Sequence, residues 1–230
     1  LLNNHWTFDA RLSNIGTDGY IDRASVDLNS YYLQGGYFAK NTSVKLIAFA
    51  GKEKTYHAWG YATKEEMEKF GRRYNPCGEM YTDADGNKHY YTDQTDNYLQ
   101  KNYQLLLNHS FSTAWNLNVA LHYTKGDGYY EEYKPGSSLV EYGLKPFNPD
   151  GTETNESDLV RQKKMDNKFG GGVFSLNYTG NRLTASLGGG LNQYRGNNFG
   201  KVTWVKNYIG NLSPEHEYYR NKSKKTDGNI

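Results

Sequence analysis

Apolar and polar side chains alternate along many stretches of the chain with a repeat of two residues. Residues 115–123 show the pattern most clearly, since five large apolar side chains alternate there with Asn, Ala and His. This repeat predicts β-strands with one apolar and one polar face. Seven long strands are predicted, over residues 6–13, 31–38, 43–57, 99–111, 115–123, 168–179 and 183–192, with shorter extended pieces at 199–205 and 226–230.

Connections between these strands are of two kinds. Residues 39–43, 112–114 and 179–182 are short and contain Asn, Gly, Ser or Thr, as hairpin turns do. Residues 58–97 and 126–166 are expected to form loops of about forty residues, a length that is usually functional. Short and long connections alternate, which predicts a meander with its long loops at one end, as in an outer-membrane β-barrel.

A medium loop is expected over residues 16–26, and a helix over residues 64–70. The helix prediction rests on Thr63, which is followed three residues later by Glu66 in a capping-box pattern.

Aromatic side chains flank the tight turns, at Tyr37, Phe111, Trp115 and Tyr178. In a membrane barrel such rings lie at a water–lipid interface. The predicted strands are also long, and they match the ~9–11 residues needed to cross lipid better than the ~5–6 of an average soluble strand. The alternative that remains is a soluble β-sandwich, whose strands alternate in the same way.

The composition is rich in rings and poor in aliphatic residues. Aromatic residues make up 15% of the 230 residues, yet the mean hydropathy is −0.91. The rings argue against disorder, and no apolar stretch approaches the ~18 residues of a spanning helix. Cys77 is the only cysteine, which excludes an intrachain disulfide framework and a cysteine-based zinc site. The net charge of +2 gives no argument for nucleic acid as a partner.

Seven to nine strands cannot close a large barrel, so the chain is either an arc of one or a small closed barrel. The polar alternate faces, rich in Asn and Gly, and the long loops favour an arc of a plugged transporter of about 22 strands. We therefore expect an all-β, antiparallel, up-and-down transmembrane barrel segment with long extracellular loops, occupying residues 1–230.

Three segments resemble the barrel of TonB-dependent receptors of the Bacteroidetes. They are GYIDRASVDLNSYYLQGGYF (19–38), SVKLIAFAGKEKTYHAWGYA (43–62) and HEYYRNKSKKTDGNI (216–230). The last departs from the family pattern at Gly228, where the family usually has an aromatic residue.

The resemblance implies active import of a scarce nutrient across the outer membrane: siderophore iron, haem, cobalamin or an oligosaccharide. It implies membrane lipid, the TonB–ExbB–ExbD complex, a small-molecule or glycan ligand and a surface lipoprotein as partners, and no nucleic acid. The family's plug domain and TonB box precede the barrel, and neither is found in this sequence. No cofactor, metal site or covalent chemistry is expected.

Aromatic residues near the long loops are the best candidates for ligand binding. Rings with polar tips can stack on sugars or on flat iron chelates and still tolerate water; packing among the loops themselves is the other interpretation. The candidates are Tyr56, Trp59, Tyr61, Tyr129, Tyr130 and Tyr133.

Other motifs give weaker evidence for a functional site. DADGN at residues 83–87 resembles a calcium loop, but Gly86 is misplaced for an EF-hand, and a hairpin tip is the preferred interpretation. The histidines are scattered without ligand spacing. Acidic pairs such as Glu131–Glu132 could serve glycoside hydrolysis but are more often solvated. The functional alternatives to transport are thus a surface adhesin-like or lectin-like sandwich and, third, a glycan-degrading enzyme.

Overall fold

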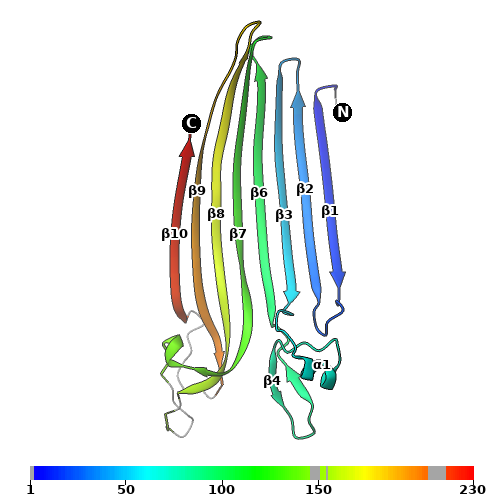
Figure 1. The fold of residues 1–230 in the computed structure, drawn as a ribbon, viewed down its shortest axis with the longest axis vertical. Coiled ribbons are helices and arrows are strands. Elements are labelled where there is room, and N and C mark those ends of the chain that lie inside the picture. Colours follow the sequence, from blue (N-terminus) through cyan, green and yellow to red (C-terminus); the bar gives the residue numbers. More distant parts are fainter. Residues whose placement is uncertain (1–2, 146–150, 154, 207–215) are drawn as a thin grey trace.

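Eight antiparallel strands form one continuous sheet in the computed structural model, which describes residues 3–145, 151–153, 155–206 and 216–230 (Figure 1). The order in the sheet is the order along the chain, interrupted only by a separate two-stranded hairpin, β4–β5. The eight strands are β1 (Trp6–Thr17), β2 (Val26–Phe38), β3 (Thr42–Tyr56), β6 (Thr95–Ser110), β7 (Trp115–Ser138), β8 (Glu156–Thr179), β9 (Thr184–Val205) and β10 (Glu217–Asn229).

The short turns lie at one end of the sheet and the long connections at the other, as predicted (Figure 1). Each tight turn is closed by a backbone hydrogen bond, for example from Ala39 N to Thr42 O at 2.8 Å and from Gly180 N to Leu183 O at 2.8 Å. The medium loop between β1 and β2 is also confirmed.

The register of the strands gives the sheet two chemically different faces. Residues directly opposite each other in neighbouring strands lie on the same face. One row of opposite residues is Phe8, Gly35, Leu46, Leu105, Leu121, Gly172 and Leu191. We call this side the apolar face.

On β7 the apolar face is continuous from Trp115 to Tyr123. These eight steps of ~3.3 Å make a band about 26 Å long in the direction of the strand. Rings stand near both limits of the band. Trp115 packs against Tyr178 at the turn end, with 4.9 Å between ring centroids, while Tyr103 and Tyr123 lie opposite each other at the other limit.

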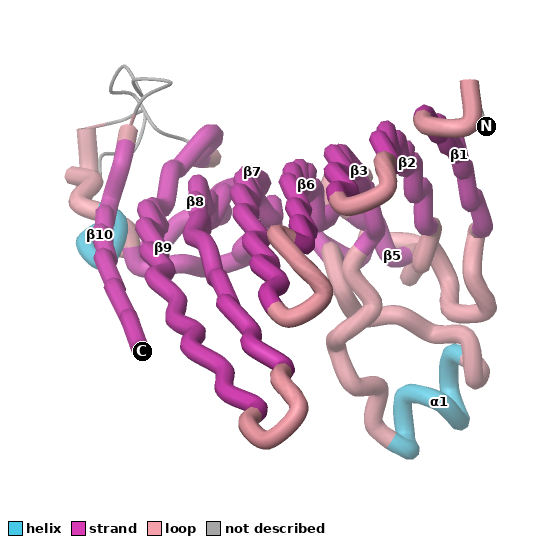
Figure 2. Tube along the Cα trace, turned by 90° about the horizontal axis from the view of Figure 1, so that it is seen from above, coloured by secondary structure: helices cyan, strands magenta, loops and turns pink. Residues whose placement is uncertain are grey.

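The apolar face is the more exposed of the two. Leu46, Leu121 and Leu191 are 59%, 47% and 62% exposed, whereas Asn102 on the other face is 9% exposed. Among the described residues no second sheet covers the apolar band, and Figure 2 shows the strands in a single curved layer. A soluble sheet would normally bury such residues.

The opposite side, which we call the polar face, is held together by side-chain hydrogen bonds between strands. Asn108 Nδ2 donates to Asn118 Oδ1 at 2.6 Å, and Asn118 Nδ2 donates to Ser175 Oγ at 3.3 Å. Next to them Ser186 Oγ donates to Asn177 Oδ1 at 2.8 Å. Because these groups satisfy one another, the cost of placing many polar side chains side by side is reduced.

The forty-residue loop predicted over residues 126–166 is wrong. Strands β7 and β8 continue far beyond the apolar band, and the actual connection is residues 139–155, which includes a 3-10 turn at Val140–Tyr142. The extension was not predicted because its side chains are mostly polar and show no alternation of hydropathy; its buried Leu159 and Val160 are consecutive. A register shift between Lys134 and Ser137 marks where regular pairing ends.

Further strand boundaries differ from the prediction, because several strands, among them β1, β2 and β6, are four or five residues longer at one end. Residues 183–192 and 199–205 belong to one strand, β9, and the last strand begins at Glu217, well before residue 226. Strand β10 is dominated by charged and polar side chains, which gives no alternation to read. Charged residues are a common way to protect the edge of a sheet.

The long connection between β3 and β6 is confirmed and has structure of its own. It contains helix α1 (Lys64–Phe70), with the predicted capping box between Thr63 and Glu66. It also contains the hairpin of β4 (Glu79–Thr82) and β5 (Lys88–Tyr90).

Contacts with the β1–β2 loop hold this connection in place. Asn75, which is buried, donates from Nδ2 to Asp22 O at 3.0 Å and to His57 O at 2.9 Å. The guanidinium of Arg23 lies 3.4 Å from the centroid of the Tyr90 ring and donates to Asn75 O.

Strands β1 and β10 form the two edges of the sheet; each is paired on one side only within the described residues. No helix of the described residues is both long and apolar enough to cross a membrane.

A close approach of strands β8 and β9 requires glycine at position 171. A Cβ built on Gly171 would lie 2.4 Å from the backbone oxygen of Leu191, whereas one on Gly35 would meet nothing within 4 Å. We predict that Gly171→Ala lowers the free energy of unfolding by roughly 1–3 kcal/mol, as overpacking does, and that Gly35→Ala leaves it unchanged or raises it slightly. Denaturant midpoints of the two variants check this; equal midpoints would contradict it.

Candidate functional site

Three rings come together on the polar face at the end of the sheet that carries the long connections. His57 and Trp59 directly follow β3, and their rings stack with centroids 3.8 Å apart. Tyr130 of β7 stands edge-on to Trp59, at 5.6 Å and an interplanar angle of 87°. We call these three residues the ring cluster. Its position follows from the register, because Tyr130 lies opposite Asp96, and Asp96 lies opposite Thr55 near the end of β3.

His57 is the most buried member of the ring cluster, at 2% exposure. Burial lowers its pKa from 6.5 to about 4, although the negative charge of Glu132 acts in the opposite direction. Its Nε2 lies 3.5 Å from Asp96 Oδ2, and neither ring nitrogen makes a hydrogen bond of good geometry within the described residues. His57 is therefore neutral at pH 7.

An ion pair fixes the strand extensions beside the ring cluster. Nε and Nη2 of Arg161 on β8 both donate to Glu132 Oε2 on β7, at 2.9 and 2.7 Å. Nη1 of Arg161 donates to the hydroxyl of Tyr142 at 3.0 Å and so connects the 3-10 turn to the sheet. Since both charged groups are largely buried, losing either partner would leave a costly unpaired charge.

A hollow of about 510 Å³ begins at Tyr130 and Asp96. Lys163 and Tyr219 also line it, and Lys163 Nζ lies 5.7 Å from the centroid of the Tyr130 ring. The hollow thus combines ring surface, a carboxylate and an ammonium group. This combination suits a polar ligand with a flat or ring-shaped face, since rings supply stacking area and charged groups fix orientation.

Of the six predicted ligand-binding residues, Trp59 and Tyr130 have their rings in contact, and Tyr129 borders the same hollow as Tyr130. The placement of Tyr129, Tyr130 and Tyr133 in a loop is wrong, because all three belong to strand β7. Neighbours in a strand point to opposite faces, and the ring of Tyr129 accordingly packs under Lys164, with Nζ at 4.4 Å from the ring centroid.

The remaining predicted residues have other surroundings. Tyr56 is buried, and its hydroxyl donates to Tyr91 O at 2.8 Å. Tyr133 is also buried, donates to Asp158 Oδ2 at 2.7 Å and stacks on Trp204. These two residues hold the long connections in place. Tyr61 is 96% exposed.

His57 and Asp96 were not among the predicted site residues. One signal was available for His57, which has the same parity as Trp59 just after a strand, so that both could be expected on one side. For Asp96 no such signal existed, because its place in the site depends on the pairing of β6 with β3 and β7.

The acidic residues considered for hydrolysis do not form a pair. Glu131 and Glu132 are consecutive in β7 and point to opposite faces, where Glu131 accepts from Tyr91 and Gln162 and Glu132 accepts from Arg161. Glu66, from the other pair, accepts from the Thr63 amide in the capping box of α1.

The DADGN segment forms a hairpin tip, as preferred. Asp83 Oδ1 accepts from the amides of Asp85 and Asn87 at 3.0 and 2.8 Å, while its Oδ2 lies 2.9 Å from Nε2 of His89. The hydrogen bond with His89 has the largest effect, and together these bonds lower the pKa of Asp83 to about 2. In the described part of the chain no three His, Cys, Asp or Glu side chains are grouped so that they could hold a metal ion.

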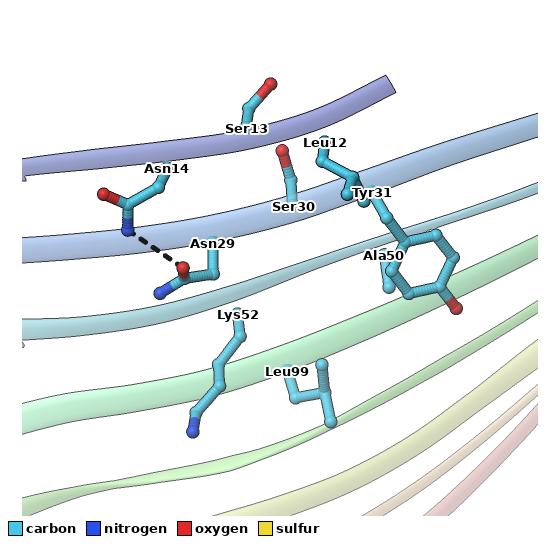
Figure 3. Close-up of a pocket in the computed structure, with 9 residues that line it drawn as sticks. All are labelled: Leu12, Ser13, Asn14, Asn29, Ser30, Tyr31, Ala50, Lys52 and Leu99. Carbon is cyan, nitrogen blue, oxygen red and sulfur yellow. Dashed lines mark hydrogen bonds between the residues drawn. The ribbon is translucent and has the colours of Figure 1, made fainter. Parts of the chain in front are cut away.

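A larger hollow, of about 620 Å³, lies across β1, β2, β3 and β6 (Figure 3). Leu12, Tyr31 and Ala50 line it from the apolar face, beside the hydrogen bond from Asn14 Nδ2 to Asn29 Oδ1 at 2.9 Å. Because it opens on the other face from the ring cluster, it does not extend the candidate site.

Comparison with known proteins assigns no family: no protein-family model and no curated protein matches the chain.

We predict that acidification loosens the ring cluster. The lowered pKa of His57 means that the packed state binds the proton less readily than the unpacked state does. The stabilisation is therefore complete above pH 6.5 and is lost progressively as the pH falls toward 4, by up to about 3 kcal/mol. Trp59 fluorescence, isolated by subtracting a Trp59→Phe variant, should change over this range.

The control for this experiment is His57→Phe, which keeps a ring beside Trp59 but removes the titrating group. Its fluorescence should stay constant between pH 7 and 4. The same pH response in both proteins would show that another group controls the cluster.

Proposed function

We propose that the chain forms part of the barrel wall of an outer-membrane, TonB-dependent active transporter. The observation that carries this proposal is the apolar band, which spans nine residues of β7 from Trp115 to Tyr123, within the ~9–11 residues that a tilted strand needs to cross lipid. Rings near both limits of the band, such as Trp115 and Tyr123, fit the aromatic girdles of those barrels.

Two further features support the proposal. The apolar face is the exposed one, and the polar face carries a hydrogen-bonded network of Asn and Ser that would suit a wet or plugged lumen. A soluble sandwich is less well supported, because it needs a second sheet over the apolar face and none lies among the described residues.

The proposed barrel is larger than this sheet. Eight strands with edges at β1 and β10 would have to pair with further strands, since unpaired backbone groups are not tolerated in lipid. A barrel of about 22 strands fits a plugged transporter. In the proposed mechanism, the ring cluster and the hollow beside it take part in capturing a glycan or another nutrient with a flat face. The plug would then rearrange under force from the TonB–ExbB–ExbD complex.

The membrane proposal predicts opposite effects at two neighbouring positions of β6. Leu105 is on the apolar face near the middle of the band, and Gln104 is on the polar face. Leu105→Lys should destabilise the assembled protein by about 2–4 kcal/mol, the cost of a cation facing lipid, whereas Gln104→Lys should be tolerated. The measurement is the amount of folded protein in the detergent-extracted outer-membrane fraction.

The wild-type protein should require detergent for extraction. Recovery of folded wild-type protein in the soluble fraction would overturn the membrane proposal whatever the variants do.

The ligand proposal predicts that Trp59→Ala weakens glycan binding roughly tenfold, because a stacked ring contributes about 0.5–1.5 kcal/mol beyond its buried area and supports Tyr130 as well. Tyr61→Ala is the matched control, since Tyr61 lies in the same connection but is almost fully exposed. Glycan-array screening followed by titration calorimetry provides the measurement. Unchanged glycan binding in the Trp59→Ala variant, or a loss no larger than that of the control, would contradict a specific role of the ring cluster.

A further inference from the structure

A row of cations marks the limit of the apolar band toward the long connections. Five neighbouring strands, β6 to β10, each place one basic residue there on the apolar face, one pleat beyond the rings of Tyr103 and Tyr123. In the register Lys101 lies opposite Lys125, Lys125 opposite Lys168, Lys168 opposite Arg195, and Arg195 opposite Lys224. We call these five residues the basic row.

Such a row is unfavourable for the sheet by itself. Like charges directly opposite each other in neighbouring strands repel at close range. Only Lys125 has an ion-pair partner among the described residues, Asp127, and that contact is long at 3.8 Å. Asp127 and Asp166 follow in the next row, but Lys52 and Lys222 lie in that row too, so its carboxylates do not balance the basic row. An anionic partner from outside the chain would remove the repulsion.

We infer that the basic row binds the phosphate groups of anionic lipids in the outer leaflet. This inference rests on the proposed function, because it places the row where the head groups begin. Lysine and arginine at that level are attracted to anionic head groups, and the rings one pleat away fit the position of an interfacial belt. At ~4.8 Å between strands the row is about 19 Å long, and a strand tilt of ~40° would spread it over roughly 12 Å of depth, enough for more than one head group.

The test uses the full-length protein purified in detergent and placed in nanodiscs. One set contains only phosphatidylcholine, and the other contains phosphatidylcholine with phosphatidylglycerol. Native mass spectrometry then counts the lipids that stay bound. The variant K125Q/K168Q/R195Q removes three cations of the basic row. The matched control R11Q/K45Q/K225Q removes three cations from the polar face of the same sheet.

We expect wild type and control to retain phosphatidylglycerol selectively and to lose it at high salt. In the basic-row variant the preference for phosphatidylglycerol should fall at least tenfold, since each cation near an anionic surface strengthens binding roughly fivefold. Circular dichroism should be the same for all three proteins, because the substitutions remove repulsion.

Three results would overturn the inference: unchanged selectivity in the basic-row variant, an equal loss in the control, or displacement of the lipid by millimolar inorganic phosphate, which would indicate a simple anion site. The proposed function fails separately. In that case the wild-type protein would be soluble without detergent. A protein that needs detergent but whose basic row shows no selectivity for phosphatidylglycerol would refute this inference alone.

Discussion

The fold and the candidate site both depend on uninterrupted pairing between neighbouring strands. Side chains alternate between faces, so a slip of one residue in any strand would exchange its apolar and polar sides. Across the apolar band the register advances one residue at a time from β1 to β10, without a bulge. In the large sheet the shifts occur near Lys134, Val160 and Glu217, all beyond the apolar band. At that end Leu159 and Val202 pack into a small separate core with residues of the 139–155 connection.

The same pairing assembles the candidate site. Strands β6 and β7 continue beyond the band, which places Asp96 opposite Tyr130. His57 and Trp59 follow the end of β3 and lie beside them. Alternation also explains why aromatic residues close in sequence separate: Tyr129 and Tyr133 lie on the other side of the sheet from Tyr130. Nearness along a strand therefore does not mean a shared surface.

The sequence predicted the strands wherever one face is apolar, together with the three tight turns and the capped helix. It did not predict the extensions of β7 and β8 or the start of β10, because these segments are mostly polar and their few apolar residues, such as Leu159 and Val160, do not alternate. Trp59 and Tyr130 could be proposed from their chemistry. Their contact, and the part played by His57, depend on how the long connection after β3 folds against Asn75 and Arg23, which no local pattern encodes.

The extension of β7 fixes how far the ring cluster stands from the apolar band. Tyr130 lies seven residues beyond Tyr123, which is about 23 Å along the strand. With a strand tilt of ~40°, the usual value in membrane barrels, the cluster would stand roughly 18 Å above the lipid boundary. In the proposed transporter, a ligand held at that height would stand clear of the lipid boundary. It could then be handed over while still attached to a bulky carrier, and the length of a strand would limit the size of the donor that can approach.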